Sequence, residues 1–187
     1  MRTLPSRLRA LALVLLALGA LPLWASEAAA QASGCGFDGC VDVVAVDGVI
    51  DEIEADFIVQ SVRGAARAGD VVGVVLQMDS PGSAVKPARL DEVARVISDS
   101  GVPVSVWVGA SGAQALGGAA ELVQVAGTSS ITPGSSIGEV RSQRLSESEF
   151  GRLFSGDLVG ALNRTYEGEA AVEAGLVDRF DATLVDH

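Results

Sequence analysis

Two glycine-containing segments follow apolar, β-rich stretches and could present backbone N–H groups to a ligand. They are residues 76–83 (LQMDSPGS) and residues 106–115 (VWVGASGAQA). Glycine allows a backbone to turn sharply and to approach a ligand closely. Two such loops can form an oxyanion hole, which needs two backbone donors aimed at one point, each worth about 3 kcal/mol of transition-state stabilisation. The candidate donors are the backbone N–H groups of Gly82, Ser83 and Gly112.

The chain has few side chains that could activate a serine for nucleophilic attack. Its one histidine is His187 and its one lysine is Lys86. Histidine and lysine are the usual bases beside a nucleophilic serine. Lys86 lies just past the first loop and precedes Pro87, and we expect its side chain to be exposed to solvent.

Three segments together resemble the ClpP-class membrane serine proteases called NfeD, which are relatives of signal peptide peptidase A. Residues 79–83 (DSPGS) resemble the family's D-T-P-G-G loop. Residues 109–117 (GASGAQALG) and residues 132–138 (TPGSSIG) resemble its blocks G-A-x-A-A-S-A-G and A-P-G-T-x-I-G. Residues 168–178 (GEAAVEAGLVD) resemble the E-A-x-x-x-G-x-x-D segment near the end of the ClpP/crotonase fold. The resemblance covers residues 41–186 and implies a single α/β domain over residues 41–187, built as the ClpP/crotonase-like ββα superhelix.

The resemblance fails at the residues that would catalyse proteolysis. Gln114 occupies the position of the family's nucleophilic serine, and an amide cannot attack a carbonyl carbon as a hydroxyl can. The family's base is a lysine after the P-G-T-x-I-G turn, whereas no lysine follows Ile137 in this chain, and the arginines that follow it stay protonated at physiological pH. Ser111, three positions before Gln114, is the candidate displaced nucleophile. Ser83 replaces a family glycine but still supplies a backbone N–H.

Three functions therefore stay open, and the sequence does not decide whether the protein is an enzyme. The first is an exported serine endopeptidase of the NfeD type with a displaced nucleophile. The second is a catalytically dead module of the same fold that binds peptides or membrane-protein segments, for assembly or as a chaperone. The third is a crotonase-like acyl-CoA enzyme, which would use the same two-amide hole on a thioester. Residue chemistry favours the second function, and the family resemblance favours the first.

The composition disfavours several classes of ligand and partner. A net charge of −11 and a pI near 4.4 argue against nucleic acid and against the phosphates of coenzyme A, which favour basic pockets. No cofactor is indicated, and two cysteines without a nearby histidine make a poor metal site, so we expect no bound metal. The expected partner is a peptide or a membrane-protein segment. Membrane association and homo-oligomerisation, which is common among relatives of this fold, stay open.

Residues 1–32 have the features of a secretory signal peptide. Three arginines precede an uncharged, leucine-rich run over residues 10–26, and the small residues at 28–32 include an A-x-A cleavage pattern. An uncleaved anchor is the alternative, because the uncharged run is only marginally long enough to span a bilayer. We therefore expect an extracytoplasmic or membrane-associated protein. In the mature N-terminus, residues 33–40, Cys35 and Cys40 bracket a glycine-containing loop and predict a disulfide in an oxidising compartment.

From residue 41 onward the pattern alternates strands with helices. Apolar runs predict strands over residues 41–46, 71–78 and 102–108, and helical periodicity predicts helices over residues 51–68 and 87–100. This alternation is typical of parallel βαβ units.

The second half of the chain is harder to assign. Residues 113–120 predict a short helix whose N-terminus would point N–H groups at the pocket, although its glycines could equally serve close packing. Residues 122–126 predict a strand, and residues 133–138 a turn. The polar segment 141–156 predicts a mobile flap or an incompletely formed helix.

Overall fold

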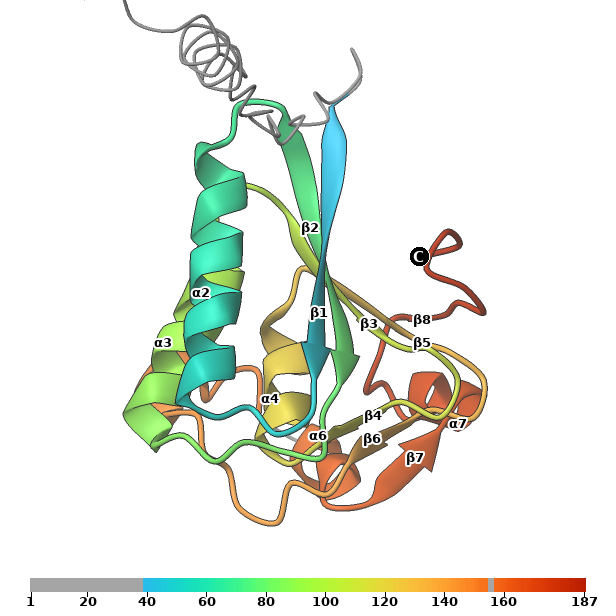
Figure 1. Ribbon diagram of the computed structural model, residues 1–187. Coiled ribbons are helices and arrows are strands. Elements are labelled where there is room, and N and C mark those ends of the chain that lie inside the picture. Colours follow the sequence, from blue (N-terminus) through green and yellow to red (C-terminus); the bar gives the residue numbers. More distant parts are fainter. Residues whose placement is uncertain (1–38, 155–156) are drawn as a thin grey trace, which may run out of the picture. The chain divides into compact units, whose positions relative to one another are not determined.

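The computed structural model describes residues 39–154 and 157–187 (Figure 1). The signal segment predicted for residues 1–32, and Cys35 of the predicted Cys35–Cys40 disulfide, lie outside the described residues, so both stay predictions. In chain order the elements are β1 (Cys40–Asp47), α2 (Glu52–Arg67), β2 (Val71–Asp79), α3 (Pro87–Ser98), β3 (Val104–Val108), β4 (Gln114–Leu116), α4 (Gly118–Val125), β5 (Thr128–Ile131), β6 (Ser136–Gly138), α5 (Glu147–Phe150), α6 (Asp157–Leu162), β7 (Thr165–Glu167), α7 (Glu169–Glu173) and β8 (Arg179–Phe180).

The main sheet contains five parallel strands in the order β1-β2-β3-β5-β8. Helices α2, α3 and α4 connect its strands and lie on the same side of the sheet in Figure 1. Right-handed crossovers that all step in one direction across a sheet place their helices on one face in this way. The α/β class and the parallel βαβ units predicted from the sequence are confirmed.

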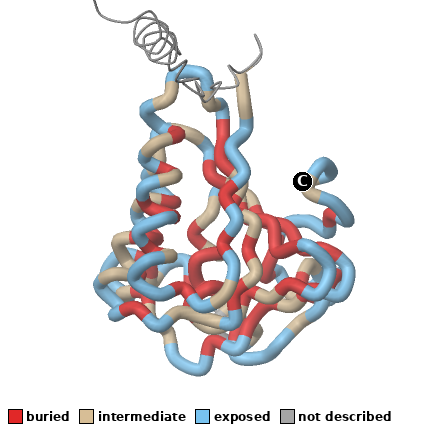
Figure 2. Tube along the Cα trace, in the orientation of Figure 1, coloured by how far each residue is buried: buried red, intermediate tan, exposed pale blue. Residues whose placement is uncertain are grey.

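The core lies between the main sheet and these helices. Figure 2 shows buried residues along the strands and on the helix sides that face them. In α2 the buried residues form one stripe, which consists of Ala55, Ile58, Val59, Val62 and Ala65. Leu76 and Met78 of β2 have no exposed surface. Most of the core residues are valine, alanine, leucine or isoleucine, so close packing of small aliphatic side chains stabilises the fold.

A smaller sheet joins the carboxyl end of the main one. In this sheet β4 pairs with β6 in parallel, and β6 pairs with β7 in antiparallel fashion. Ser80, the residue after β2, forms a parallel bridge with Ala115 in the middle of β4. The small sheet therefore meets the main sheet where the loop after β2 begins.

Two predicted elements after the second junction are wrong. Residues 114–116 form a strand rather than part of a helix, and residues 122–125 belong to helix α4 rather than to a strand. Seven of the eight residues of α4 are buried. A helix that is buried on nearly every side shows no clear amphipathic period, and a short, mainly apolar run of this kind cannot be assigned from periodicity alone. The strand that returns to the main sheet is instead β5.

The first helix offers a test of local stability. The Asp51 carboxylate caps α2, because its Oδ1 accepts hydrogen bonds of 2.9 Å from the N–H groups of Ile53 and Glu54. Asp51→Ala should lower the free energy of unfolding by about 1 kcal/mol, measured by urea denaturation. Asp51→Ser keeps an acceptor oxygen and should recover most of that loss. Equal stability of Asp51→Ala and the original chain would contradict this role for the cap.

Candidate functional site

The two glycine-containing loops lie side by side, as the sequence analysis requires for a shared site. The Ser80 N–H donates to the Gln114 carbonyl oxygen at 2.6 Å, and the Leu116 N–H donates to the Ser80 carbonyl oxygen at 3.0 Å. These bonds form the parallel bridge between Ser80 and Ala115. The loop after β2 and the segment that becomes β4 are therefore joined through their backbones.

The Ser80 side chain shapes the first loop. Its hydroxyl donates to the Gly82 carbonyl oxygen at 2.9 Å and accepts from the Gly82 N–H at 3.2 Å. Ser80 is fully buried, and Gly82 has a φ of 144°, a region that favours glycine. The Gly82 carbonyl oxygen also accepts from the Ile50 N–H at 2.9 Å. The Gly82 N–H is thus used within the turn.

Gln114, which the sequence analysis matched to the family's nucleophile, begins β4. Its backbone N–H donates to Asp79 Oδ1 at 3.0 Å. Asp79 ends β2, so this bond adds a second link between the two loops. The Gln114 side chain is partly exposed. Its amide is therefore a group that a ligand could contact, but it offers no nucleophile.

Ser111, the candidate displaced nucleophile, is exposed, and its hydroxyl donates to the Pro133 carbonyl oxygen at 2.7 Å. A peptide carbonyl does not take up a proton, so this bond positions the hydroxyl without activating it. The nearby Ser135 hydroxyl donates to the Ala110 carbonyl oxygen at 3.0 Å and ties the second glycine-containing loop to the segment between β5 and β6. In this arrangement Ser111 acts as a loop contact.

The N–H groups of Ser83 and Gly112 stay available. No acceptor within the described chain is hydrogen bonded to either of them. Gly112 has a φ of 88°, which again favours glycine. Of the three predicted donors, these two are therefore not used by the fold itself, and the oxyanion hole stays a prediction that rests on them.

A buried carboxylate that the sequence analysis missed lies next to this region. Glu121, in the first turn of α4, has no exposed surface. Its Oε1 and Oε2 accept from the Arg144 N–H at 2.8 and 3.1 Å, and Oε2 also accepts from the Leu145 N–H at 2.8 Å. Burial raises the pKa of Glu121, and these backbone bonds, with the charge of Arg144, partly oppose that increase. A single acid inside an apolar run was the sequence signal for this site.

Arg144 connects Glu121 to the first loop. Its guanidinium donates to the Ser83 carbonyl oxygen at 3.0 Å and also to the Val85 carbonyl oxygen. The Ser83 side chain in turn packs on α4, because a Cβ built on Gly118 would lie 2.1 Å from Ser83 Oγ. The segment after β6 therefore holds the loop that carries the Ser83 N–H against α4.

Comparison with models of known protein families finds no match, and neither does comparison with curated protein sequences. Solved structures do match. The 1510-N membrane protease specific for a stomatin homolog from Pyrococcus horikoshii is 16% identical over 79% of this chain and 76% of that chain, with a TM-score of 0.66. A lysine-to-alanine mutant of the 1510-N membrane-bound stomatin-specific protease, in complex with a substrate peptide, is 18% identical over 81% of this chain and 79% of that chain, with a TM-score of 0.67.

An enoyl-CoA hydratase from Shewanella pealeana also matches, with 14% identity over 77% of this chain and 66% of that chain and a TM-score of 0.57. The chain has the ClpP/crotonase-like fold. At sequence identities this low, the structural matches establish the fold alone, and the activity has to be argued from the site. Among the helices of the described residues, none has both the length and the apolar composition needed to cross a bilayer.

The role of Arg144 can be tested by stability. Arg144→Ala removes two hydrogen bonds to backbone carbonyls of the first loop, so we expect the free energy of unfolding to fall by about 2 kcal/mol in urea denaturation. Arg141→Ala is the matched control, because the Arg141 side chain is 88% exposed and its nearest acid, Glu139, is 3.8 Å away. This control should change stability by less than about 0.5 kcal/mol. Similar losses in the two variants would contradict the role given to Arg144.

Proposed function

We propose that this chain is an exported, peptide-binding domain of the NfeD type that keeps the fold of a serine protease without the usual catalytic pair. The observation that carries this proposal is that neither of the two candidate side chains, Gln114 and Ser111, is an activated nucleophile. Gln114 stands where the nucleophile would be, and the Ser111 hydroxyl is bonded to the Pro133 carbonyl oxygen rather than to a base. A site without an activated nucleophile can bind a carbonyl group but cannot attack it.

Peptide is the ligand that the available groups suit best. Peptides carry regularly spaced carbonyl oxygens, and the N–H groups of Ser83 and Gly112 have no acceptor among the described residues. The partly exposed Gln114 amide can both donate to and accept from a peptide backbone. A protein with the same fold binds a substrate peptide, which supports this choice of ligand. We propose the peptide segments of membrane proteins as the class of partner.

Two other functions are kept as alternatives. An exported endopeptidase with Ser111 as its displaced nucleophile would need a base that reaches Ser111 once peptide is bound. A crotonase-like acyl-CoA enzyme is supported by the match to an enoyl-CoA hydratase, but a net charge of −11 disfavours a ligand that carries phosphates. The predicted signal segment also argues for a site outside the cytoplasm, where peptides are the better candidates.

The proposal predicts binding without cleavage. Fluorescence anisotropy with labelled apolar peptides should show saturable binding to the full chain, and mass spectrometry should show no product. Removal of a nucleophile typically slows turnover by about 10⁶. Ser111→Ala should therefore leave both the binding and the absence of cleavage unchanged. Cleavage at ordinary enzyme rates that Ser111→Ala abolishes would establish the displaced-serine alternative instead.

A second pair of variants tests where the peptide binds. Gln114→Leu keeps the size of the side chain but removes its hydrogen-bonding groups, so we expect peptide affinity to fall about fivefold to tenfold. Gln60→Leu makes the same change on an exposed position of α2 and should leave affinity unaltered. Equal affinities for both variants and the original chain would place the peptide elsewhere, and failure of every peptide to bind would refute the proposal.

A further inference from the structure

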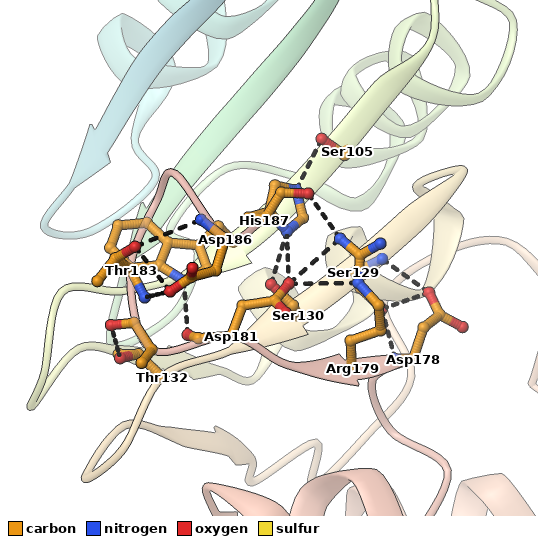
Figure 3. Close-up of polar contacts among 12 residues, drawn as sticks. Ser105, Ser129, Ser130, Thr132, Asp178, Arg179, Asp181, Thr183, Asp186 and His187 are labelled. Atoms are coloured by element: carbon orange, nitrogen blue, oxygen red, sulfur yellow. Dashed lines mark hydrogen bonds and ion pairs between the residues drawn. The ribbon is translucent and has the colours of Figure 1, made fainter.

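The chain's only histidine, His187, lies between hydroxyl groups of two strands of the main sheet (Figure 3). Its Nε2 is 2.8 Å from Ser105 Oγ on β3, and its Nδ1 is 2.6 Å from Ser130 Oγ on β5. Asp181 Oδ2 is 3.5 Å from the same Nδ1. The His187 side chain is 2% exposed, so water hardly competes for these contacts. A serine, an imidazole and a carboxylate thus follow one another in the order that serine hydrolases use.

The surroundings favour a neutral ring that carries its proton on Nδ1. Burial, with the charge of Arg179, lowers the pKa of His187, and the Asp181 carboxylate partly opposes this. These two are the charged groups that face the ring, whereas β3 and β5 face it with the hydroxyls of Ser105 and Ser130. A carboxylate beside Nδ1 attracts the ring proton to that nitrogen, and Nε2 is then free to accept from the Ser105 hydroxyl at 2.8 Å. The other acceptor within reach of that hydroxyl, the Val74 carbonyl oxygen, is farther away, at 3.4 Å. In this form the ring can take a proton from Ser105.

Contacts independent of the ring hold Asp181 in place. Its N–H donates to the Ile131 carbonyl oxygen at 3.1 Å, and its carbonyl oxygen accepts from Trp107 Nε1 at 3.3 Å. Its carboxylate accepts from Arg179 Nε at 3.3 Å, and Arg179 also donates to the His187 carbonyl oxygen at 2.6 Å. The carboxylate and the imidazole are therefore fixed relative to each other.

A cavity of about 410 Å³ opens beside the Ser105–His187 pair. The other residues that line it are mainly apolar and include Val41, Val43, Val75, Pro103, Leu184 and Val185. Apolar walls with a few convergent polar groups are typical of small-molecule sites of this size. Ser105 is near the amino end of β3, whereas the loop with Ser111 follows the carboxyl end of that strand, so this cavity is separate from the proposed peptide site.

We propose that Ser105 is a nucleophile activated by His187 and that the cavity accepts the acyl chain of a small uncharged ester. Ser105 Oγ attacks the ester carbonyl carbon while its proton passes to His187 Nε2. The bond between that carbon and the alcohol oxygen then breaks, and the alcohol leaves with the proton. Water attacks the acyl-serine by the same route and gives its proton to His187, which returns it to Ser105 Oγ as the carboxylic acid leaves. An uncharged ester suits a protein whose net charge is −11.

The position of Ser105 limits the rate of this reaction. Ser105 lies inside β3, with β2 paired on one side and β5 on the other. Its backbone N–H therefore belongs to the hydrogen-bond ladder of the sheet and cannot stabilise an oxyanion. One missing oxyanion donor slows acyl transfer by about 10²–10³. We therefore expect reaction with strongly activated reagents, such as p-nitrophenyl butyrate and fluorophosphonates, and slow turnover.

The experiment is fluorophosphonate labelling of the full chain, followed by peptide mapping of the adduct. We expect one adduct, on Ser105, and we expect Ser105→Ala to abolish it. His187→Gln keeps a side chain that can hydrogen bond to Ser105 but removes the base, so labelling should slow by about 100-fold or more. Ser98→Ala, on the exposed end of α3, is the matched control and should label normally. Far-UV circular dichroism of each variant checks that it is folded.

The labelling rate should also depend on pH through the imidazole. Only the neutral ring accepts a proton, and burial lowers its pKa below the ordinary 6.5, so the rate should rise with pH and have its midpoint below pH 6.5. The His187→Gln variant should lose this inflection. No adduct on Ser105 in the folded protein, or an adduct whose rate does not respond to His187→Gln, would overturn the proposal. An adduct on Ser111 alone would also overturn it and would support the displaced-serine protease instead.

Discussion

The backbone pairing of Ser80 with Ala115 is the interaction on which the candidate site depends. It begins one residue after β2 ends and joins the main sheet to the small sheet through two hydrogen bonds. Ser80 is fully buried, so water cannot replace these bonds, and each backbone group left unpaired would cost about 1–3 kcal/mol. The turn at Gly82 and the start of β4 at Gln114 are both set by this pairing. The two loops are neighbours in the fold for that reason, although more than thirty residues of sequence separate Ser80 from Ala115.

Glu121 reinforces that arrangement at an electrostatic cost. Burial raises its pKa, so ionisation is less favourable in the folded chain than in the unfolded one. The contribution of this group to stability therefore falls as pH rises from its ordinary value of 4.5 through the raised value. The N–H groups of Arg144 and Leu145 limit that cost by bonding to the carboxylate. In return the Arg144 guanidinium is held where it can bond to the backbone of the first loop. A buried acid thus orders a segment that its own polar sequence would leave exposed.

The sequence predicts the first half of the fold well and the second half poorly, for a physical reason. Strands β1, β2 and β3 and helices α2 and α3 have either continuous apolar runs or a clear helical period, and their predicted bounds agree with the structure within a few residues. Most residues from Gln114 to Ile131 are buried, and their apolar pattern therefore has no clear helical or strand period. The motif positions of Gly82, Ser83 and Gln114 could be named from the sequence. The contacts of Glu121 and His187 could not, because their partners are brought close only by the fold.

The two serines associated with β3 show why the fold by itself does not decide the chemistry. Ser111 follows the carboxyl end of that strand, close to the position expected for a nucleophile, but its hydroxyl donates to a carbonyl oxygen. Ser105 is near the amino end of the same strand, and its hydroxyl lies 2.8 Å from the imidazole Nε2 of His187. Reactivity follows the acceptor of the hydroxyl proton rather than the location of the serine. On that criterion the motif-bearing end of the sheet is suited to binding, and the opposite end holds the activated serine.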